Sequence, residues 1–503
     1  MHFHKERVAS YAKSPDYSVP LSQLFDTPKP ENGSEQPQTS LLSKFLAIHK
    51  NDDALAWRIA LIEQAKHTID AQYYSWHADT SGQLLVSKLI ETADRVVRVR
   101  LLLDDIHTLG ADRRIATLNR HKNIEVRIFN AFKIRWPIRL FRVFELLWNL
   151  NRLNHRMHNK LLIADNIVSI IGGRNIGDEF FGLNKSFVFR DLDLMISGAA
   201  VEKLSYSFDL FWNSSVSKTA RRIIAFRPGR LDFRHMQKRL NKNISVSQQV
   251  IDRIDKLKND LLNNSGLQNE LISSEAQVFY DLPDAESIEE KHMAHDLYQC
   301  NMHTKKQLTI ISAYFIPSKA LIASLQALIA NGVRIQVLTN SLASIDVTPA
   351  FTGYERYRHQ LLEMGVELFE FRAEPEHHTS YSTSTVNVDY ISLHAKSIIY
   401  DDNSVYVGSL NLDPRSENLN TEIGLFVKNA ELAKSVHRVF MEDLNEGKYL
   451  QVKYNEQGQL TWQFADEIIT IQPARSLWQR ISKSIYSLLP IQRRTMNVLP
   501  VFP

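Results

Sequence analysis

Two stretches of the chain share one pattern of polar residues: HNKLLIADNIVSIIGGRN at residues 158–175 and HAKSIIYDDNSVYVGSLN at residues 394–411. Both read H-x-K-x4-D-x6-G-x-x-N, with the same gaps between the polar positions. One copy could arise by chance, but two copies with equal spacing indicate an internal duplication with a long period.

The segments around the two stretches repeat in the same order. The strand-like segment VVRVRLLLDD at 96–105 corresponds to GVRIQVLTNS at 332–341, and NIEVRIFN at 123–130 corresponds to the segment that begins at Val366. Segments with helical spacing of apolar residues lie between these strands, as in SKALIASLQALIANG at 318–332. Strands that alternate with helices predict an α/β layered fold in two similar halves.

The spacing inside each motif predicts a hairpin that carries a cationic pocket. His and Lys two residues apart on a strand point to the same face of the sheet. Asp165-Asn166 and Asp401-Asp402-Asn403 are turn residues between two apolar strands. Glycine allows close approach of the backbone, and the Asn that follows can donate hydrogen bonds from its amide group.

Two histidines, two lysines and two asparagines that face one another would suit a phosphate diester. One imidazole can attack phosphorus, and Lys and Asn can stabilise the charge on the equatorial oxygens. The other imidazole can protonate the leaving oxygen as a general acid.

The composition of the chain excludes several kinds of site and several classes of protein. The 503 residues correspond to about three domains or two large ones, and 44% hydrophobic with 23% charged residues is ordinary for a globular protein. The single cysteine, Cys300, excludes an intrachain disulfide and a cysteine-based metal site. The net charge of +4 is too small to indicate nucleic acid binding but is compatible with an anionic partner. No apolar segment is long enough to predict a membrane-spanning helix, and the first residues lack the apolar core of a secretory signal.

In these motifs the chain resembles the phospholipase D superfamily, whose signature is a duplicated H-x-K-x4-D motif; the resemblance covers about residues 45–445. Within the superfamily it is most similar to bacterial cardiolipin synthases of the C type, through segments such as GGRNIGDEFF and GSLNLDPRSENLNTEIGL. The resemblance implies two similar α/β/α sandwich domains packed face to face around one active site. The expected divisions are an N-terminal segment with a disordered linker at 1–45, a first domain at 46–215, a helical connector at 216–284, a second domain at 285–450 and a C-terminal extension at 451–503.

The resemblance also implies roles for the residues of the motifs. His158 matches the family's nucleophile and His394 its acid and base, although the two roles could be exchanged because the halves are quasi-equivalent. Asp191 and Glu422 match carboxylates that orient the histidines through the second ring nitrogen. Phosphate contacts are implied for Lys160, Lys396, Asn175 and Asn411.

Four further residues of the motifs differ in what they are expected to do. Asp165 and Asp401 belong to the signature but are expected to brace the hairpins rather than to react. Gly173 stands where many relatives have Ser, as Ser409 does in the second half, so one hydroxyl near the substrate phosphate is expected to be missing. The halves are therefore not interchangeable.

The implied reaction transfers a phosphatidyl group from phosphatidylglycerol, through a phosphohistidine, to the alcohol of a second phospholipid. That acceptor would be phosphatidylglycerol or phosphatidylethanolamine, and no metal or other cofactor would be needed. The expected partner is an anionic bilayer surface at the cytoplasmic face of the bacterial inner membrane, with no nucleic acid. Two alternatives remain: a hydrolytic phospholipase D that releases phosphatidic acid, and a nuclease or phosphodiesterase of the same superfamily.

Two segments combine basic and aromatic residues in a way that suits an anionic bilayer surface. The first is KIRWPIRLFRVFELLWNLNRLNHR at 133–156, for which the alternative is a core helix with solvated arginines. The second is SLWQRISKSIYSLLPIQRR at 476–494, for which the alternative is ordinary packing onto the second domain. The basic residues of the first segment are Lys133, Arg135, Arg139, Arg142, Arg152 and Arg156.

Overall fold

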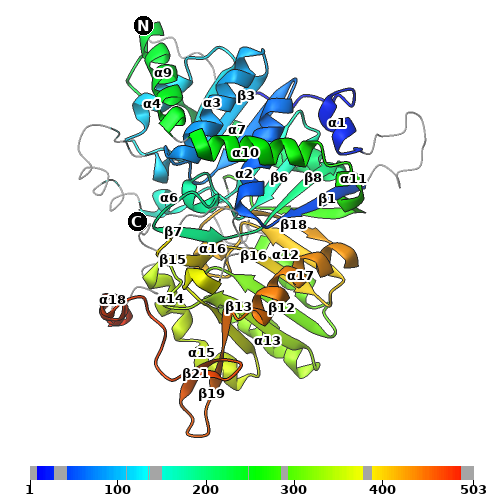
Figure 1. Ribbon diagram of the computed structural model, residues 1–503, viewed down its shortest axis with the longest axis vertical. Helices are drawn as coiled ribbons and strands as arrows, with labels where there is room; N and C mark the ends of the chain where they lie inside the picture. The colour runs from blue at the N-terminus through cyan, green and yellow to red at the C-terminus, as the bar shows by residue number, and fades with distance from the viewer. Residues whose placement is uncertain are drawn as a thin grey trace.

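The computed structural model describes residues 8–27, 42–108, 110–133, 135, 145, 150–246, 248–284, 293–377 and 388–488. Within these residues the chain forms two large mixed sheets, one in each half, which Figure 1 shows stacked along the long axis of the molecule. The two-domain α/β architecture expected from the sequence is confirmed.

The first sheet has a parallel centre, β2-β3-β4, flanked by antiparallel strands. Strand β2 reads TIDAQY and is buried along its whole length, as expected for a strand covered on both faces. The order across the sheet is β10 (Ile272–Ser274), β1 (Ser43–Ile48), β8 (Asp193–Gly198), β6 (Val168–Gly172), β5 (Lys160–Ala164), β2 (Thr68–Tyr73), β3 (Arg98–Asp104), β4 (Ile124–Phe129) and β9 (Ser217–Thr219).

The second sheet repeats this order over seven strands, so that β1, β8, β6, β5, β2, β3 and β4 correspond to β11, β18, β17, β16, β12, β13 and β14. The duplication indicated by the two motifs is therefore confirmed at the level of topology. The order is β11 (Ala276–Tyr280), β18 (Ile423–Val427), β17 (Ser404–Gly408), β16 (Lys396–Tyr400), β12 (Gln307–Ser312), β13 (Arg334–Asn340), β14 (Glu367–Phe371), β19 (Tyr449–Tyr454), β20 (Leu460–Phe464) and β21 (Glu467–Ile469).

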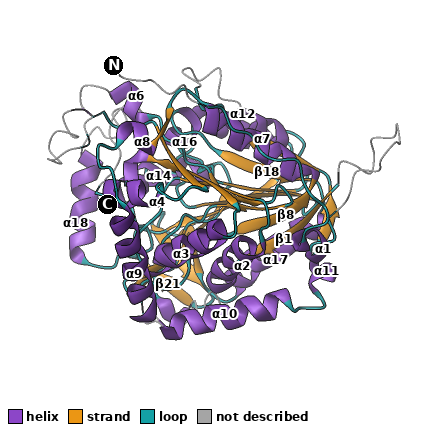
Figure 2. Cartoon of the chain, turned by 90° about the horizontal axis from the view of Figure 1, so that it is seen from above, coloured by secondary structure: helices purple, strands orange, loops and turns teal. Residues whose placement is uncertain are grey.

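Helices cover the outer face of each sheet and also fill the space between the sheets (Figures 1 and 2). The outer layers are α2 (Asn51–Gln64), α3 (Thr80–Asp94) and α4 (Asp112–Leu118) in the first half, and α12 (Met293–Asn301), α13 (Lys319–Ala330), α14 (Thr348–Glu355) and α15 (Arg358–Glu363) in the second. Between the sheets, α7 (Ala199–Asn213) and α17 (Ala430–Asn445) share one apolar cluster that contains side chains from both halves. Helix α7 contacts β11 of the second sheet, and α17 contacts β1 of the first, so each half reaches into the other.

The segment expected to be a helical connector belongs largely to the first domain. Its first strand, β9, pairs with β4, and β10 near its end pairs with β1. Strand β11 then begins the second sheet, so the halves meet at Glu275, between β10 and β11. The helices between are α8 (Ala220–Ile223), α9 (Arg230–Val246), α10 (Gln248–Leu262) and α11 (Leu267–Glu270), of which α10 packs on α2 and α9 on α3 and α4.

Two other expected boundaries also differ from the structure. Residues 8–27, with α1 (Pro20–Leu24), pack on the first domain: Leu21 and Phe25 are buried, and the Phe25 ring lies 5.8 Å from that of Trp57. The expected linker at 28–41 lies outside the described residues. At the other end, the proposed boundary at 451 falls inside β19, because β19, β20 and β21 extend the second sheet.

The basic segment at 133–156 lies mostly outside the described residues, which there include α6 (Leu150–Asn154). Its Arg135 is described, and the side chain of this residue is only 6% exposed. The Arg135 guanidinium lies 2.6 Å from a carboxylate oxygen of Asp105 and 2.6 Å from one of Asp112. Arg156 is likewise buried, 3.1 Å from Asp104. These two arginines therefore do not form part of a membrane-facing surface.

Candidate active site

Each motif forms the expected hairpin. Strands β5 and β6 pair through the turn at Asp165 and Asn166, and β16 and β17 pair through the turn at Asp401 and Asp402. All four turn residues have φ between 53° and 55°, a left-handed conformation that Asp and Asn tolerate better than other side chains. The hairpin places Lys160 and Lys396 at the first residue of β5 and β16, with the histidines two positions earlier.

Each histidine is anchored to the opposite half by backbone hydrogen bonds. The His158 amide donates to the Thr421 carbonyl over 2.9 Å, and the His394 amide donates to the Arg190 carbonyl over 2.7 Å. A small parallel sheet of β7 (Phe187–Arg190) and β15 (Tyr390–Leu393) also joins the halves just before Asp191 and His394. The two motifs therefore converge on one site.

Carboxylates from the opposite half face the Nδ1 atoms of both histidines. His158 Nδ1 lies 2.8 Å from Glu422 Oε2, and His394 Nδ1 lies 2.6 Å from Asp191 Oδ2. A carboxylate in this position selects the tautomer with its proton on Nδ1 and leaves the Nε2 lone pair available. The sequence indicated that these two acids orient the histidines, and the structure adds that the pairs are crossed between the halves.

Burial and neighbouring lysines keep both imidazoles neutral. Burial, followed by the charges of Lys160 and Lys396, holds the pKa of His158 well below its usual range. Burial and the charge of Lys396 likewise lower the pKa of His394 to about 3. A neutral imidazole with a free Nε2 is the form that can attack phosphorus.

The lysines lie close to the histidines in both halves. Lys160 Nζ donates to the His158 carbonyl over 2.5 Å, and Lys396 Nζ donates to the His394 carbonyl. Burial lowers the pKa of Lys396 to about 8 and that of Lys160 well below its usual value. An anionic ligand would favour the ammonium form of both side chains.

The two orienting carboxylates differ in ionisation. Burial raises the pKa of Glu422 to about 7, although Lys160 and a hydrogen bond from Ser409 oppose the shift. Burial also acts to raise the pKa of Asp191, but its interaction with His394 and the charge of Lys396 outweigh it, and this pKa is lowered. Glu422 is therefore the orienting carboxylate that titrates near neutral pH.

The difference between Gly173 and Ser409 follows from these carboxylates. A Cβ atom at Gly173 would lie 2.2 Å from Asp191 Oδ1, so the first half has no room for Ser there. In the second half the Ser409 hydroxyl donates to Glu422 Oε2 over 2.5 Å and accepts from the Ile423 amide over 3.0 Å. The Ser409 hydroxyl therefore supports the Glu422 carboxylate.

Asn175 and Asn411 are buried directly after the hairpins, with 5% and 3% of their surface exposed. The Asn175 Oδ1 atom accepts from the Ser75 amide over 3.2 Å, which leaves its NH2 group as the donor. Both positions are compatible with the expected phosphate contacts.

Asp165 and Asp401 lie at the far ends of β5 and β16 from the histidines. Asp165 accepts hydrogen bonds of 2.7–2.9 Å from the amides of Lys66, His67 and Thr68. Asp401 accepts the equivalent bonds of 2.7–2.9 Å from the amides of residues 305, 306 and 307. Both carboxylates therefore brace the start of a central strand.

Several residues beside the histidines carried no signal strong enough to be selected from the sequence. The Tyr74 ring lies edge-on 5.0 Å from that of His158, and the Phe189 ring lies 4.7 Å from that of His394. Asp104 accepts from the Met157 amide over 2.9 Å, and Asn340 accepts from the Leu393 amide over 2.9 Å. The last two acceptors occupy equivalent ends of β3 and β13, where alignment of the two halves could have found them.

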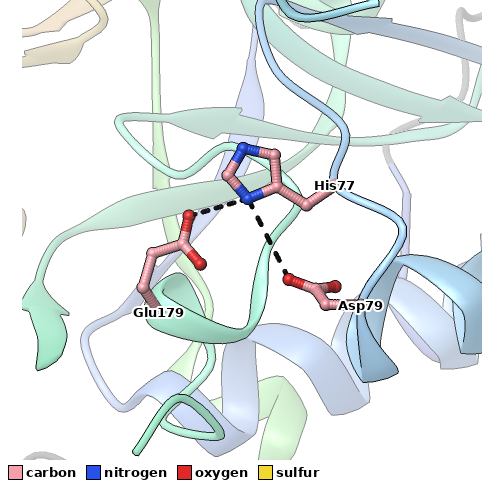
Figure 3. A group of neighbouring side chains, drawn as sticks. All are labelled: His77, Asp79 and Glu179. Carbon is pink, nitrogen blue, oxygen red and sulfur yellow. Dashed lines mark ion pairs between the residues drawn. The ribbon is translucent and has the colours of Figure 1, made fainter. Parts of the chain in front are cut away.

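Among the described residues, His77, Asp79 and Glu179 form a group with the composition of a metal site (Figure 3). Existing contacts account for most of their polar atoms. His77 Nδ1 lies 3.1 Å from Glu179 Oε1, and Asp79 caps α3 by accepting from the Gly82 amide over 3.1 Å. The other Asp79 oxygen accepts from the Asp178 amide over 2.7 Å. The group is thus explained as an ion pair beside a helix cap.

Comparison with known proteins identifies the family of the chain. Residues 59–212 and 297–444 match the family described as "Cardiolipin synthase, PLD-like domain". The chain is 34% identical to cardiolipin synthase C of Escherichia coli over 88% of this chain and 94% of that one. It is 26% identical to the major cardiolipin synthase ClsA of Bacillus subtilis over 85% of this chain and 71% of that one. A phosphatidylserine synthase structure from Haemophilus influenzae has the same fold, with a TM-score of 0.55 at 14% identity, over 88% of this chain and 95% of that one.

Proposed function

This chain belongs to the family of cardiolipin synthases with a phospholipase D-like domain, and we propose that it is a phosphatidyltransferase that makes cardiolipin. The donor is phosphatidylglycerol, and the acceptor is the alcohol of a second phospholipid, phosphatidylglycerol or phosphatidylethanolamine. The observation that carries the proposal is the pair of neutral histidines, each held at Nδ1 by a carboxylate of the other half and flanked by a lysine.

In the first step, His158 Nε2 attacks the phosphorus of the donor, and the bond from phosphorus to the departing glycerol oxygen breaks. Lys160 and Lys396 stabilise the charge on the other phosphate oxygens. The anionic diester raises the pKa of His394, so that Nε2 takes up a proton from solvent when the substrate binds and then gives this proton to the departing oxygen.

In the second step, His394 takes the proton of the acceptor hydroxyl. The acceptor oxygen attacks phosphorus, the bond from phosphorus to His158 breaks, and the neutral imidazole is restored. Glu422 stabilises the His158 ring while it carries positive charge in the intermediate.

Water could replace the acceptor lipid, which would make the enzyme a hydrolytic phospholipase D. Burial of the site favours transfer, because His158 and His394 are only 8% and 6% exposed. The Phe180 and Phe189 rings pack against His394 and further restrict access.

Thin-layer chromatography of lipids after incubation of the pure protein with phosphatidylglycerol liposomes tests the proposal, with and without phosphatidylethanolamine. Cardiolipin as the main product supports it. Phosphatidic acid alone would identify the hydrolytic alternative, and unchanged lipid would overturn lipid transfer and direct attention to nucleic acid diesters.

The bilayer would be met from its surface. No helix in the described part of the chain is long and apolar enough to cross a membrane. Helix α18 (Leu477–Leu488) exposes a row of large apolar side chains: Leu477 is 73% exposed, Trp478 71%, Ile481 40% and Ile485 52%. Such an amphipathic helix suits the interface of an anionic bilayer, here the cytoplasmic face of the inner membrane.

The place of α18 in the fold supports this role. It packs on α14, and Gln479 Nε2 donates to the Leu342 carbonyl over 2.5 Å. Arg475, just before the helix, donates to the Ile345 carbonyl over 2.9 Å. The loop that receives both bonds carries Asp346, whose charge acts on Lys396 in the active site. Helix α18 is therefore joined by two hydrogen bonds to the loop that carries Asp346.

A further inference from the structure

An apolar cavity in the first domain lies between the sheet and its outer helices. Its empty volume is about 790 Å³, with the open mouth included. Strands β3 and β4 form one wall of the cavity, and helices α3 and α4 form its sides. Helix α9, from the segment that was expected to be a helical connector, covers it. Apolar side chains from these elements include Leu101, Leu103, Val126, Val86, Ile115 and Leu240.

One end of the cavity lies near the catalytic histidine. Tyr74 lines the cavity, and its ring lies 5.0 Å from that of His158 and 4.8 Å from that of His107. Lys160 Nζ lies 5.3 Å from the centre of the same Tyr74 ring. The Tyr74 ring thus lies between Lys160, which is expected to contact the substrate phosphate, and the apolar wall of the cavity.

Polar residues also line the cavity, among them Asp104, His107 and Arg114. Arg114 is exposed and His77 is partly exposed, whereas Leu101, Ile115 and Leu240 are each less than 10% exposed. Burial lowers the pKa of His107 to about 4, so this lining side chain is neutral at neutral pH. A ligand that fills the cavity would have an anionic end at the lysines and an apolar body beside Tyr74.

We propose that this cavity binds one acyl chain of the phosphatidyl donor while its phosphate contacts His158 and Lys160. The proposal rests on the proposed function and adds where the lipid's apolar part is held. A diacyl phospholipid has this combination of an anionic phosphate with an adjacent hydrocarbon chain, and burial of each methylene favours binding. The position of α9 would then limit the length of acyl chain that the cavity holds.

Chain-length dependence of the reaction tests the proposal. Met236 lines the cavity from α9 and lies outside the catalytic cluster, so Met236→Trp should fill part of the space. We expect kcat/KM for dioleoyl phosphatidylglycerol to fall roughly tenfold or more, because several methylenes lose their buried contacts. With dihexanoyl phosphatidylglycerol kcat/KM should remain within about twofold, because a short chain needs little of the cavity.

The matched control is His235→Trp, which places the same ring on the exposed side of α9. It should leave both substrates unaffected. Equal loss on both lipids with Met236→Trp, or no loss on either, would overturn the proposal. If Met236→Trp does not fold, Met236→Ala, which enlarges the cavity, should instead raise the preference for the longer chain; an unchanged preference would overturn the proposal as well.

A photoreactive diazirine in the acyl chain of phosphatidylglycerol provides a second measurement on the wild-type protein. Labelled peptides should contain residues 101–103, 115–118 or 236–240. Label confined to α18 or the second domain, or no label, would overturn the acyl site while leaving cardiolipin synthesis intact. Failure of the wild-type protein to convert any phosphatidylglycerol would instead overturn the proposed function.

Discussion

His158 and His394 occupy equivalent positions but have different surroundings, since Glu422 titrates near neutral pH and Asp191 does not. Each has its own step in the proposed reaction, so neither can replace the other. We predict that His158→Ala and His394→Ala each lower kcat by about a thousandfold or more. Steady-state formation of cardiolipin measures this loss.

Trapping of the phosphatidyl-enzyme distinguishes the two roles. With radiolabelled phosphatidylglycerol, His394→Ala should accumulate labelled protein, provided that the substitution slows formation of the phosphatidyl-enzyme less than it slows its breakdown. His158→Ala should show no labelled protein. Retention of more than a few per cent of turnover in either variant would contradict the two-histidine mechanism.

The pH dependence of kcat/KM should follow the buried groups of the free enzyme. Glu422, with its pKa raised to about 7, must be ionised to hold His158, so the rate should fall as the pH drops below about 7. Lys396, with its pKa lowered to about 8, must be protonated to bind the phosphate, so the rate should fall above about 8.

Ser409→Ala provides the control for the acidic limb. The Ser409 hydroxyl lowers the pKa of Glu422, so its removal should move the acidic limb to higher pH and leave the alkaline limb in place. An acidic limb that does not move would show that Glu422 is not the group observed.

The two hairpins are held by carboxylates with different exposure, and this allows their bracing role to be tested. Asp165 is 2% exposed and Asp401 is partly exposed. We predict that Asp165→Ala lowers the free energy of unfolding by about 2–3 kcal/mol, because three backbone amides at the start of β2 lose their acceptor. Asp401→Ala should cost about 1 kcal/mol, because water reaches its site more easily.

Urea denaturation followed by circular dichroism measures both changes. Turnover at a temperature where each variant is folded should remain close to the wild-type value. Loss of turnover without loss of stability would mean that these aspartates act in the reaction.

Helix α18 is the element we expect to contact the bilayer. Replacement of Trp478 and Ile485 by Ser should lower binding to anionic liposomes in a sedimentation assay by about tenfold, since two large apolar side chains would no longer insert. Activity on dispersed dihexanoyl phosphatidylglycerol should be nearly unchanged. The control is Gln463→Ser on β20, and equal liposome binding by the α18 variant and the wild type would leave α18 as a purely structural helix.

The positive charge of the active site comes from two lysines, Lys160 in the first half of the molecule and Lys396 in the second. We therefore predict that cardiolipin synthesis survives treatment with EDTA, measured on detergent-dispersed substrate so that ions do not act through lipid packing. Loss with EDTA and recovery with a divalent ion would contradict this account, and His77, Asp79 and Glu179 would be the first residues to substitute.

Local patterns in the sequence were sufficient to predict the duplicated α/β halves, the hairpins and the residues that flank each histidine. Strand periodicity and turn residues act over a few positions, so β5–β6 and β16–β17 could be recognised without tertiary contacts. The family motif also selected Asp191 and Glu422 as the orienting acids.

Other features required the packing of segments far apart in the chain. The crossed pairs, the reason why Gly173 replaces Ser, and the burial of Arg135 depend on contacts between separate elements. The same is true of the boundary at Glu275 and of the cavity under α9. A side chain's pKa and its access to solvent depend on neighbours brought together by folding, and one-dimensional spacing does not contain that information.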